Sequence, residues 1–174
     1  MKLDQVTIDQ LKNGDDTQFE KLYHDTKRGV YGIVFSILRD HDKTADVLQE
    51  VYMKVLIKIN QYKVGSNFNS WIMQIAKNHA IDVYRSDIKQ VKMDDEVLEN
   101  IISDQTEKPD KKTLALMMLD ILDQDERTIV VLKILDDLTH KEISKIVNKP
   151  LGTVLWIYQK AMVKLKGYYG EKNA

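Results

Sequence analysis

A polar helix face between residues 66 and 85 carries side chains that can bind nucleic acid. Amides, a hydroxyl and cations recur there at helical three-and-four spacing, and such groups donate hydrogen bonds to base edges and to phosphate oxygens. These residues are Asn69, Ser70, Gln74, Lys77, Asn78 and Arg85. The same pattern fits an ordinary solvated helix surface, so the rest of the chain must decide between the two.

The opposite face of this stretch is apolar and must be buried against other elements. Its apolar residues are Phe68, Trp71, Ile72, Ile75, Ala76, Ala80 and Val83. Gly65 interrupts the preceding segment, and Ser66 or Asn67 can accept from the unpaired amides of a first helical turn. We expect a helix that begins here, with Phe68 and Trp71 in the core.

Composition limits the classes of function. The chain has 174 residues, 43% of them hydrophobic, and a net charge of −1. It can build one or two cores but has no global basic field, so any DNA binding must be local or assisted. The absence of cysteine excludes thiolate zinc sites and disulfides. Without a signal core or a bilayer-length apolar run, we expect a soluble, cytoplasmic protein with no membrane insertion.

Residues that support catalysis or metal binding are not arranged together. The four histidines are scattered at His24, His41, His79 and His140, with no His-Glu-x-x-His pair, and no glycine-rich phosphate loop is present. We therefore predict no cofactor, no metal site and no catalytic activity. His79 is expected at the edge of the core rather than as a metal ligand.

The periodicity predicts an all-α fold of two small helical domains. Apolar residues recur at helical spacing through most of the chain, which contains only seven Gly and two Pro. The first domain is predicted over residues 1–86, with a helix at 7–13, another from 15 or 16, a core segment through 30–38 and a helix at 43–62. Residues 87–112 contain eight acidic and five basic side chains and form an acidic linker.

The second domain, residues 113–174, has the pattern of a helix-turn-helix. After a predicted helix at 113–122, Asp123 with Glu126 and Thr139 with Glu142 each have the spacing of a capping box that starts a helix. The helix that starts at Thr139 ends at 148–150, and a last helix is expected over 151–168. Spacing alone fits either a DNA-binding helix-turn-helix or an ordinary helical hairpin.

Three motifs, in this order and spacing, resemble those of bacterial sigma factors of the extracytoplasmic-function (ECF) class. They are Asp46-Val47-Leu48-Gln49-Glu50-Val51-Tyr52, then Phe68-Asn69-Ser70-Trp71-Ile72 with Ile75-Ala76-Lys77-Asn78, and Leu138-Thr139-His140-Lys141-Glu142-Ile143 with Gly152-Thr153-Val154. The resemblance covers roughly residues 16 to 166. It implies a promoter-specificity subunit that binds core RNA polymerase and promoter DNA, and commonly an anti-sigma protein.

The resemblance also implies roles for particular residues. It assigns core-polymerase binding to Asp46, Gln49, Glu50 and Lys54. It assigns the melted minus-ten element to Ser66, Asn67, Lys77, Asn78 and Arg85, with the loop at 63–67 forming part of a base pocket. It assigns the minus-thirty-five element to Thr153, Leu155, Trp156, Gln159 and Lys160 on the last helix.

Two positions in the last helix depart from the family pattern. Leu155 and Trp156 stand where ECF proteins usually present small, polar or basic residues, and Pro150 stands where a serine is common. Two alternatives therefore remain open. One is a helix-turn-helix regulator that binds duplex DNA through residues 113–168 alone; the other is a helical interaction protein whose DNA-binding face has decayed.

Overall fold

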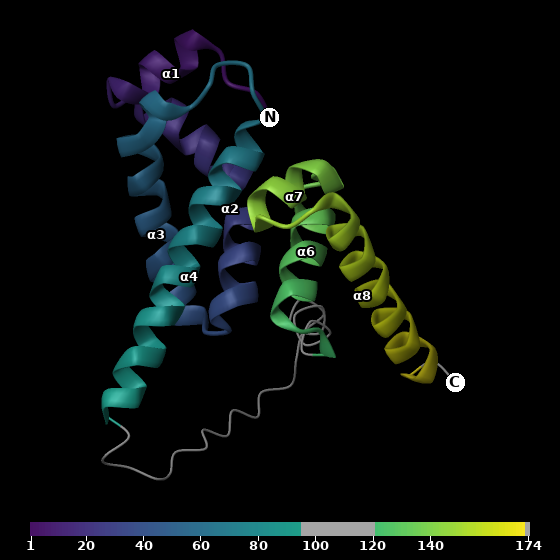
Figure 1. Ribbon diagram of the computed structural model, residues 1–174. Coiled ribbons are helices and arrows are strands. Elements are labelled where there is room, and N and C mark those ends of the chain that lie inside the picture. Colours follow the sequence, from purple (N-terminus) through teal and green to yellow (C-terminus); the bar gives the residue numbers. More distant parts are fainter. Residues whose placement is uncertain (95–120, 173–174) are drawn as a thin grey trace.

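The computed structural model describes residues 1–94 and 121–172, with side chains for residues 1–87 and 121–168. The described residues form α-helices and one short 3-10 helix and contain no strand, which confirms the all-α prediction. Two groups of helices lie side by side, coloured purple to teal and green to yellow in Figure 1. None of the described helices combines the length and apolar character needed to cross a bilayer.

The first group consists of α1 (Gln5–Lys12), α2 (Asp16–Leu38), α3 (His41–Lys58), the 3-10 helix η1 (Ile59–Gln61) and α4 (Phe68–Asp94). An aspartate starts each of the first three helices, because the side chains of Asp4, Asp15 and Asp40 accept from amides of the first turn. Asn67 does the same for α4, where its Oδ1 accepts from the Ser70 amide at 3.4 Å.

The second group consists of α6 (Gln124–Leu135), α7 (His140–Val147) and α8 (Leu151–Lys172). Both predicted capping boxes are present, with Asp123 and Glu126 at the start of α6 and Thr139 and Glu142 at the start of α7. Asn148 ends α7 in the left-handed conformation with φ of 54°. The short turn that follows leads directly into α8, so the helix-turn-helix geometry is formed.

Several helix limits differ from those predicted. Residues 16–38 form one continuous helix instead of two segments, because Gly29 and Gly32 are accommodated inside α2. Helix α4 continues to Asp94, past the expected domain limit at residue 86, and α8 continues to Lys172. The helix predicted at 113–122 and most of the predicted linker lie outside the described residues, so the division into domains stays a prediction.

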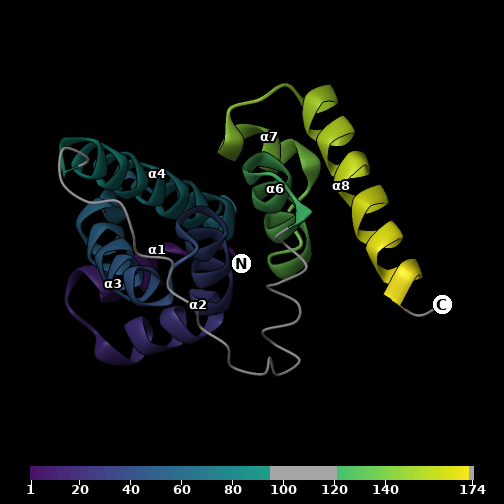
Figure 2. The same cartoon turned by 90° about the horizontal axis from the view of Figure 1, so that it is seen from below.

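The two helix groups share one hydrophobic core. Buried residues of α2 and α4, such as Ile33, Phe68 and Ile72, belong to the same cluster as Ile129 and Leu132 of α6. Figure 2, seen from below, shows α6 and α7 packed beside α2 and α4. Because burial of apolar surface is the main stabilising term in folding, this shared core holds the two groups together.

Candidate nucleic-acid interface

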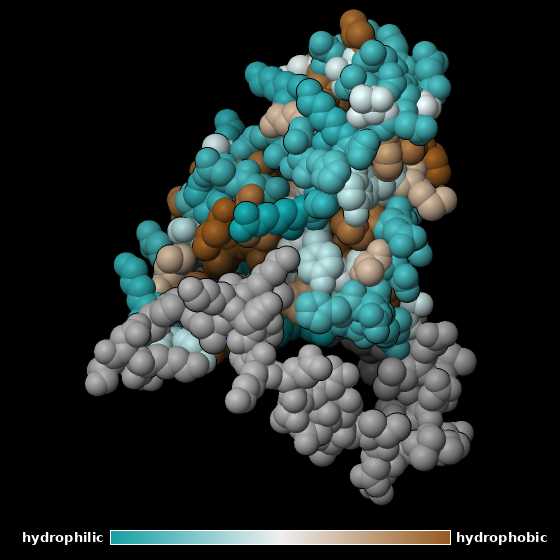
Figure 3. Space-filling view, turned by 180° about the vertical axis from the view of Figure 1, so that it is seen from behind, coloured by the Kyte–Doolittle hydropathy of each residue, from teal (hydrophilic) through white to brown (hydrophobic). Residues whose placement is uncertain are grey.

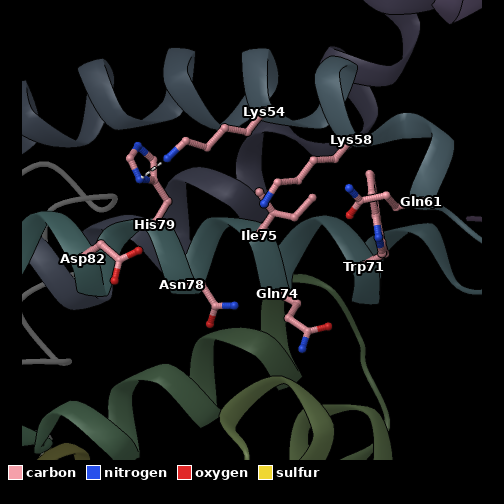
Figure 4. A pocket seen from close by; sticks show the side chains of 9 residues that line it. All are labelled: Lys54, Lys58, Gln61, Trp71, Gln74, Ile75, Asn78, His79 and Asp82. Atoms are coloured by element: carbon pink, nitrogen blue, oxygen red, sulfur yellow. Dashed lines mark hydrogen bonds between the residues drawn. The ribbon is translucent and has the colours of Figure 1, made fainter.

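A groove lies between α3 and α4 on the first helix group. It encloses about 190 Å³ and is lined by Lys54, Lys58, Gln61, Trp71, Gln74, Ile75, Asn78, His79 and Asp82. Figure 4 shows Lys54 and Lys58 reaching from α3 toward α4, and Gln74 and Asn78 pointing toward the second helix group. Since pockets for whole small molecules measure about 300–1,000 Å³, this one suits a single planar group.

The lining of this groove combines the groups that hold single-stranded nucleic acid. Trp71 offers an aromatic face for stacking, while Lys58 offers a cation for the backbone. Gln74 and Asn78 are exposed amides that can pair with base edges. The sequence identified Gln74 and Asn78 on the polar face of their own helix, but it did not identify Lys58 and Gln61, which join them only because α3 and η1 pack beside α4.

Trp71 and His79 lie at the edge of the core. Phe68 is fully buried as expected, but Trp71 is only half-buried and faces the groove, so its prediction as a core residue was only partly right. His79 Nδ1 accepts from Lys54 Nζ at 2.7 Å and its Nε2 is hydrogen-bonded to the Glu50 carboxylate. A boundary position for His79 is therefore confirmed, and this histidine ties α3 to α4.

Other predicted minus-ten residues lie apart from this groove. The loop at 63–67 does not line it, and Tyr62 Oη donates to the Ser66 carbonyl at 2.5 Å. Asn67 Nδ2 donates to Glu142 Oε1 at 2.5 Å, and Lys77 Nζ donates to the Ile146 carbonyl at 2.9 Å. Asn67 and Lys77 are thus both engaged by α7, whereas Arg85 is exposed further along α4.

Three of the four predicted polymerase-binding residues are exposed on α3, whereas Lys54 is half-buried and lines the groove toward α4. Asp46, Gln49 and Glu50 are exposed. Met53 and Ile57 continue the same helical stripe and are 63% and 74% exposed. The exposure of Met53 and Ile57 was not predicted from the sequence. Large apolar side chains that recur on one exposed face are typical of a protein contact surface.

All five residues predicted to read the minus-thirty-five element are exposed on α8. They are Thr153, Leu155, Trp156, Gln159 and Lys160. In Figure 3, which views the molecule from behind, hydrophobic residues break the hydrophilic surface on the side where α8 lies. Trp156 is 61% exposed, and Lys160 Nζ lies 5.4 Å from the centre of its ring.

A buried carboxylate holds α8 against α6. Glu126 is 1% exposed, and its two oxygens lie 3.1 Å from Lys160 Nζ and 2.6 Å from Lys164 Nζ. Burial acts to raise the pKa of Glu126, but hydrogen bonds from Lys164, the Asp123 amide and Lys160 outweigh it and lower the pKa to about 2. Lys160 is therefore part of the packing between the two helices as well as part of the exposed face.

Comparisons with known proteins agree with this geometry. Residues 22–89 match the family model for sigma-70 region 2, and residues 118–167 match the model for sigma-70 region 4. The RNA polymerase sigma factor SigV of Bacillus subtilis is 32% identical over 130 residues, which cover 75% of this chain and 78% of that protein. The chain belongs to the ECF class of sigma factors.

Other similar proteins include one whose name gives this class. The ECF RNA polymerase sigma factor SigW of Bacillus subtilis is 27% identical over 84% of this sigma factor and 86% of its own length. A sigma factor RpoE solved with the anti-sigma factor NepR from Bartonella quintana has a TM-score of 0.72 at 20% identity, over 86% of this chain and 94% of that one. CnrH, solved with the cytosolic domain of CnrY, has a TM-score of 0.67 at 16% identity, over 97% of both chains. At these identities the two structures show a common fold.

Proposed function

We propose that the helix groups of this ECF sigma factor divide promoter recognition between them. The protein is an alternative sigma factor that binds core RNA polymerase and directs it to specific promoters. The first group, α1 to α4, would dock on the polymerase and capture the melted minus-ten strand. The second group, α6 to α8, would read the minus-thirty-five element as a duplex.

The groove between α3 and α4 is the observation that carries the minus-ten assignment. A half-buried tryptophan, a lysine and exposed amides line one small cavity, and this combination binds an unpaired base and its phosphate. We assign Asn78 to the base and Arg85 to the backbone. Ser66, Asn67 and Lys77 would complete the strand path where α4 begins and where it faces α7.

The outer face of α3 is the proposed polymerase contact. Asp46, Gln49, Glu50 and Lys54 supply polar groups, and the exposed side chains of Met53 and Ile57 supply apolar area. Interfaces of this kind combine a desolvated apolar centre with a polar rim. The hydrogen bonds of His79 to Glu50 and Lys54 would hold this face in a fixed relation to the groove.

The exposed face of α8 is the proposed minus-thirty-five reader. Gln159 can pair with adenine and Leu155 can contact a thymine methyl, while Thr153 near the helix start is available to a phosphate. Trp156 and Lys160 lie beside them, with Lys160 partly held by Glu126. We infer no catalytic activity for the chain, a cytoplasmic site of action beside the polymerase, and an anti-sigma protein as a regulatory partner.

A single substitution in the groove tests the minus-ten assignment. Asn78→Ala should reduce open-complex formation, measured by permanganate reactivity of the melted strand, at least tenfold more than it reduces co-elution with core polymerase. Asn13→Ala removes an exposed amide at the end of α1, outside the lining of the groove, and serves as the matched control. Equal losses in both measurements would overturn the assignment.

A further inference from the structure

His79 of α4 lies between two side chains of α3 that would ordinarily pair with each other. Glu50 and Lys54 are four positions apart, in the order that favours an ion pair along a helix. In the described part of the chain, no direct ion pair joins them. Instead Lys54 Nζ donates to His79 Nδ1 at 2.7 Å, and His79 Nε2 is hydrogen-bonded to the Glu50 carboxylate. An imidazole from the neighbouring helix thus separates the cation from the anion.

These two partners determine which nitrogen of His79 carries the proton. An ammonium has only donors, so Nδ1 accepts from Lys54 with its lone pair. An ionised carboxylate only accepts, so the proton lies on Nε2 and is donated to Glu50. His79 is therefore a neutral imidazole, and it binds the Lys54 ammonium without neutralising its charge.

The same contact holds the Lys54 ammonium at the groove between α3 and α4. Lys54 and His79 both line this groove, next to Asn78, and Figure 4 shows the Lys54 side chain extended to the His79 ring. An ammonium has three N–H groups, and His79 takes one of them. Lys54 makes no other hydrogen bond to the described residues, so two donors are left for an anion in the groove.

Lys58, the other lysine of the groove, is not held in this way. Its side chain is exposed and forms neither a hydrogen bond nor an ion pair with the described residues. A lysine of this kind loses rotamer freedom when it binds a phosphate, and that loss weakens the contact. Lys54 has already lost much of this freedom on folding, so it is the better preorganised cation of the two.

We propose that His79 is a positioning residue that holds the Lys54 ammonium in place for a phosphate of the melted minus-ten strand. Lys54 is then a strand-binding residue, although the family resemblance assigns it to the polymerase contact. By standing between Lys54 and Glu50, His79 prevents an ion pair that would withdraw one cation from the groove. This inference rests on the proposed assignment of the groove to the minus-ten strand.

The salt dependence of open-complex formation tests the role of Lys54. Each phosphate of a single strand that a protein cation neutralises adds about 0.7 to the slope of log affinity against log salt concentration. Lys54→Met keeps the apolar stem and removes the charge, so holoenzyme with this variant should show a slope shallower by about 0.7. The assay uses a promoter that the wild-type protein opens and core polymerase saturated with each variant.

Lys21→Met is the matched control, because it removes an exposed lysine of α2 outside the lining of the groove. Its slope should equal that of the wild type. Co-elution of Lys54→Met with core polymerase should stay within twofold of wild type. An unchanged slope for Lys54→Met would overturn the proposal, and a tenfold loss of co-elution with an unchanged slope would return Lys54 to the polymerase contact.

His79→Leu separates positioning from packing. Leucine fills the space beside α3 but cannot accept from Lys54, so we expect Lys54 to pair with Glu50 and the slope to become shallower by the same amount of about 0.7. The fraction of protein that is folded does not alter this slope. A purely structural role of His79 would therefore reduce the yield of open complex and leave the slope at the wild-type value, which would contradict the proposal.

The double variant His79→Leu with Lys54→Met tests whether His79 acts through Lys54. If it does, the double variant should have the slope of Lys54→Met alone. A further change of about 0.7 would show that the two residues act separately and would overturn the positioning role.

Wild-type protein assayed alongside separates this inference from the proposed function. If wild-type holoenzyme forms no open complex at any promoter, the proposed function is wrong. If it forms open complexes and Lys54→Met has the same slope, only the role of Lys54 and His79 is wrong.

Discussion

The side-chain amide of Asn67 donates a hydrogen bond to Glu142 Oε1 at 2.5 Å, and the two residues are 75 positions apart in the sequence. The other Glu142 oxygen accepts from the Thr139 amide and hydroxyl, so one carboxylate both caps α7 and joins α7 to the start of α4. The two helix groups are thereby linked through one side chain.

Removal of this carboxylate should therefore lower the stability of the folded protein. Glu142→Ala removes a capping box and a hydrogen bond between helix groups, and we expect it to lower the free energy of unfolding by about 1–3 kcal/mol. Urea titration measures the loss. Glu20→Ala, which changes an exposed glutamate of α2, is the control and should stay within about 0.5 kcal/mol of wild type.

Glu126 should stabilise the helix-turn-helix through its two lysines. Glu126→Gln keeps the shape of the side chain but removes the charge paired with Lys160 and Lys164, so we expect a loss of about 1–3 kcal/mol at neutral pH. Because the pKa of Glu126 is lowered to about 2, its contribution is present above pH 4.5 and is lost as the pH falls from 4.5 toward 2. Thermal unfolding across this range should show the two proteins converging in acid; a constant difference would contradict the ion-pair explanation.

Asp136 should have the opposite pH dependence. Burial raises the pKa of its carboxyl to about 6. Gly29 of α2 packs against this carboxyl, and Tyr52 of α3 is close enough to interact with it; burial raises the pKa of the Tyr52 hydroxyl, which therefore stays protonated. The folded chain therefore binds this proton more tightly than the unfolded chain does, and stability falls as the pH rises from about 4 to 6.

Asp136→Asn removes that ionisation. At pH 7.5 it should stabilise the chain by about 1–3 kcal/mol relative to wild type, and the gain should disappear near pH 4. Urea titration of both proteins at pH 4 and pH 7.5 measures the difference. Equal stabilities at pH 7.5 would contradict a buried, destabilising carboxylate at this position.

The apolar end of the α3 face should contribute to polymerase binding. Ile57→Asp places a charge on a side chain that is 74% exposed, so folding should be unaffected while the affinity for core polymerase falls at least tenfold. Val6→Asp makes the same change at an exposed valine of α1 and is the control. Equal affinity of the two variants, measured by competition with a labelled sigma factor, would exclude Ile57 from the interface.

Local sequence patterns predicted the helices well, because the residues that start and end a helix lie only a few positions apart. The capping boxes at Asp123 and Thr139 each follow from two polar residues three positions apart. The end of α7 follows from Asn148, which takes the left-handed conformation. The uninterrupted α2 was not predicted, because Gly29 and Gly32 weaken a helix in isolation and are explained only by the contact with Leu135 and Asp136.

The site was predicted less completely, because its contacts join distant segments. Asn78 was identified from its own helix, but Lys58 and Gln61 enter the groove from α3 and η1 through tertiary packing. Lys160 was expected to face DNA, and its ion pairs with Glu126 depend on how α8 lies on α6. The engagement of Asn67 and Lys77 by α7 follows from the packing of the two described helix groups, which no local spacing encodes.

The most direct test of the account is run-off transcription by bacterial core RNA polymerase on sheared genomic DNA of the source organism, with and without this protein. The account predicts initiation at discrete sites only when the protein is present, with a shared minus-ten and minus-thirty-five sequence upstream of each start. The absence of protein-dependent initiation, together with no co-elution with core polymerase, would contradict it.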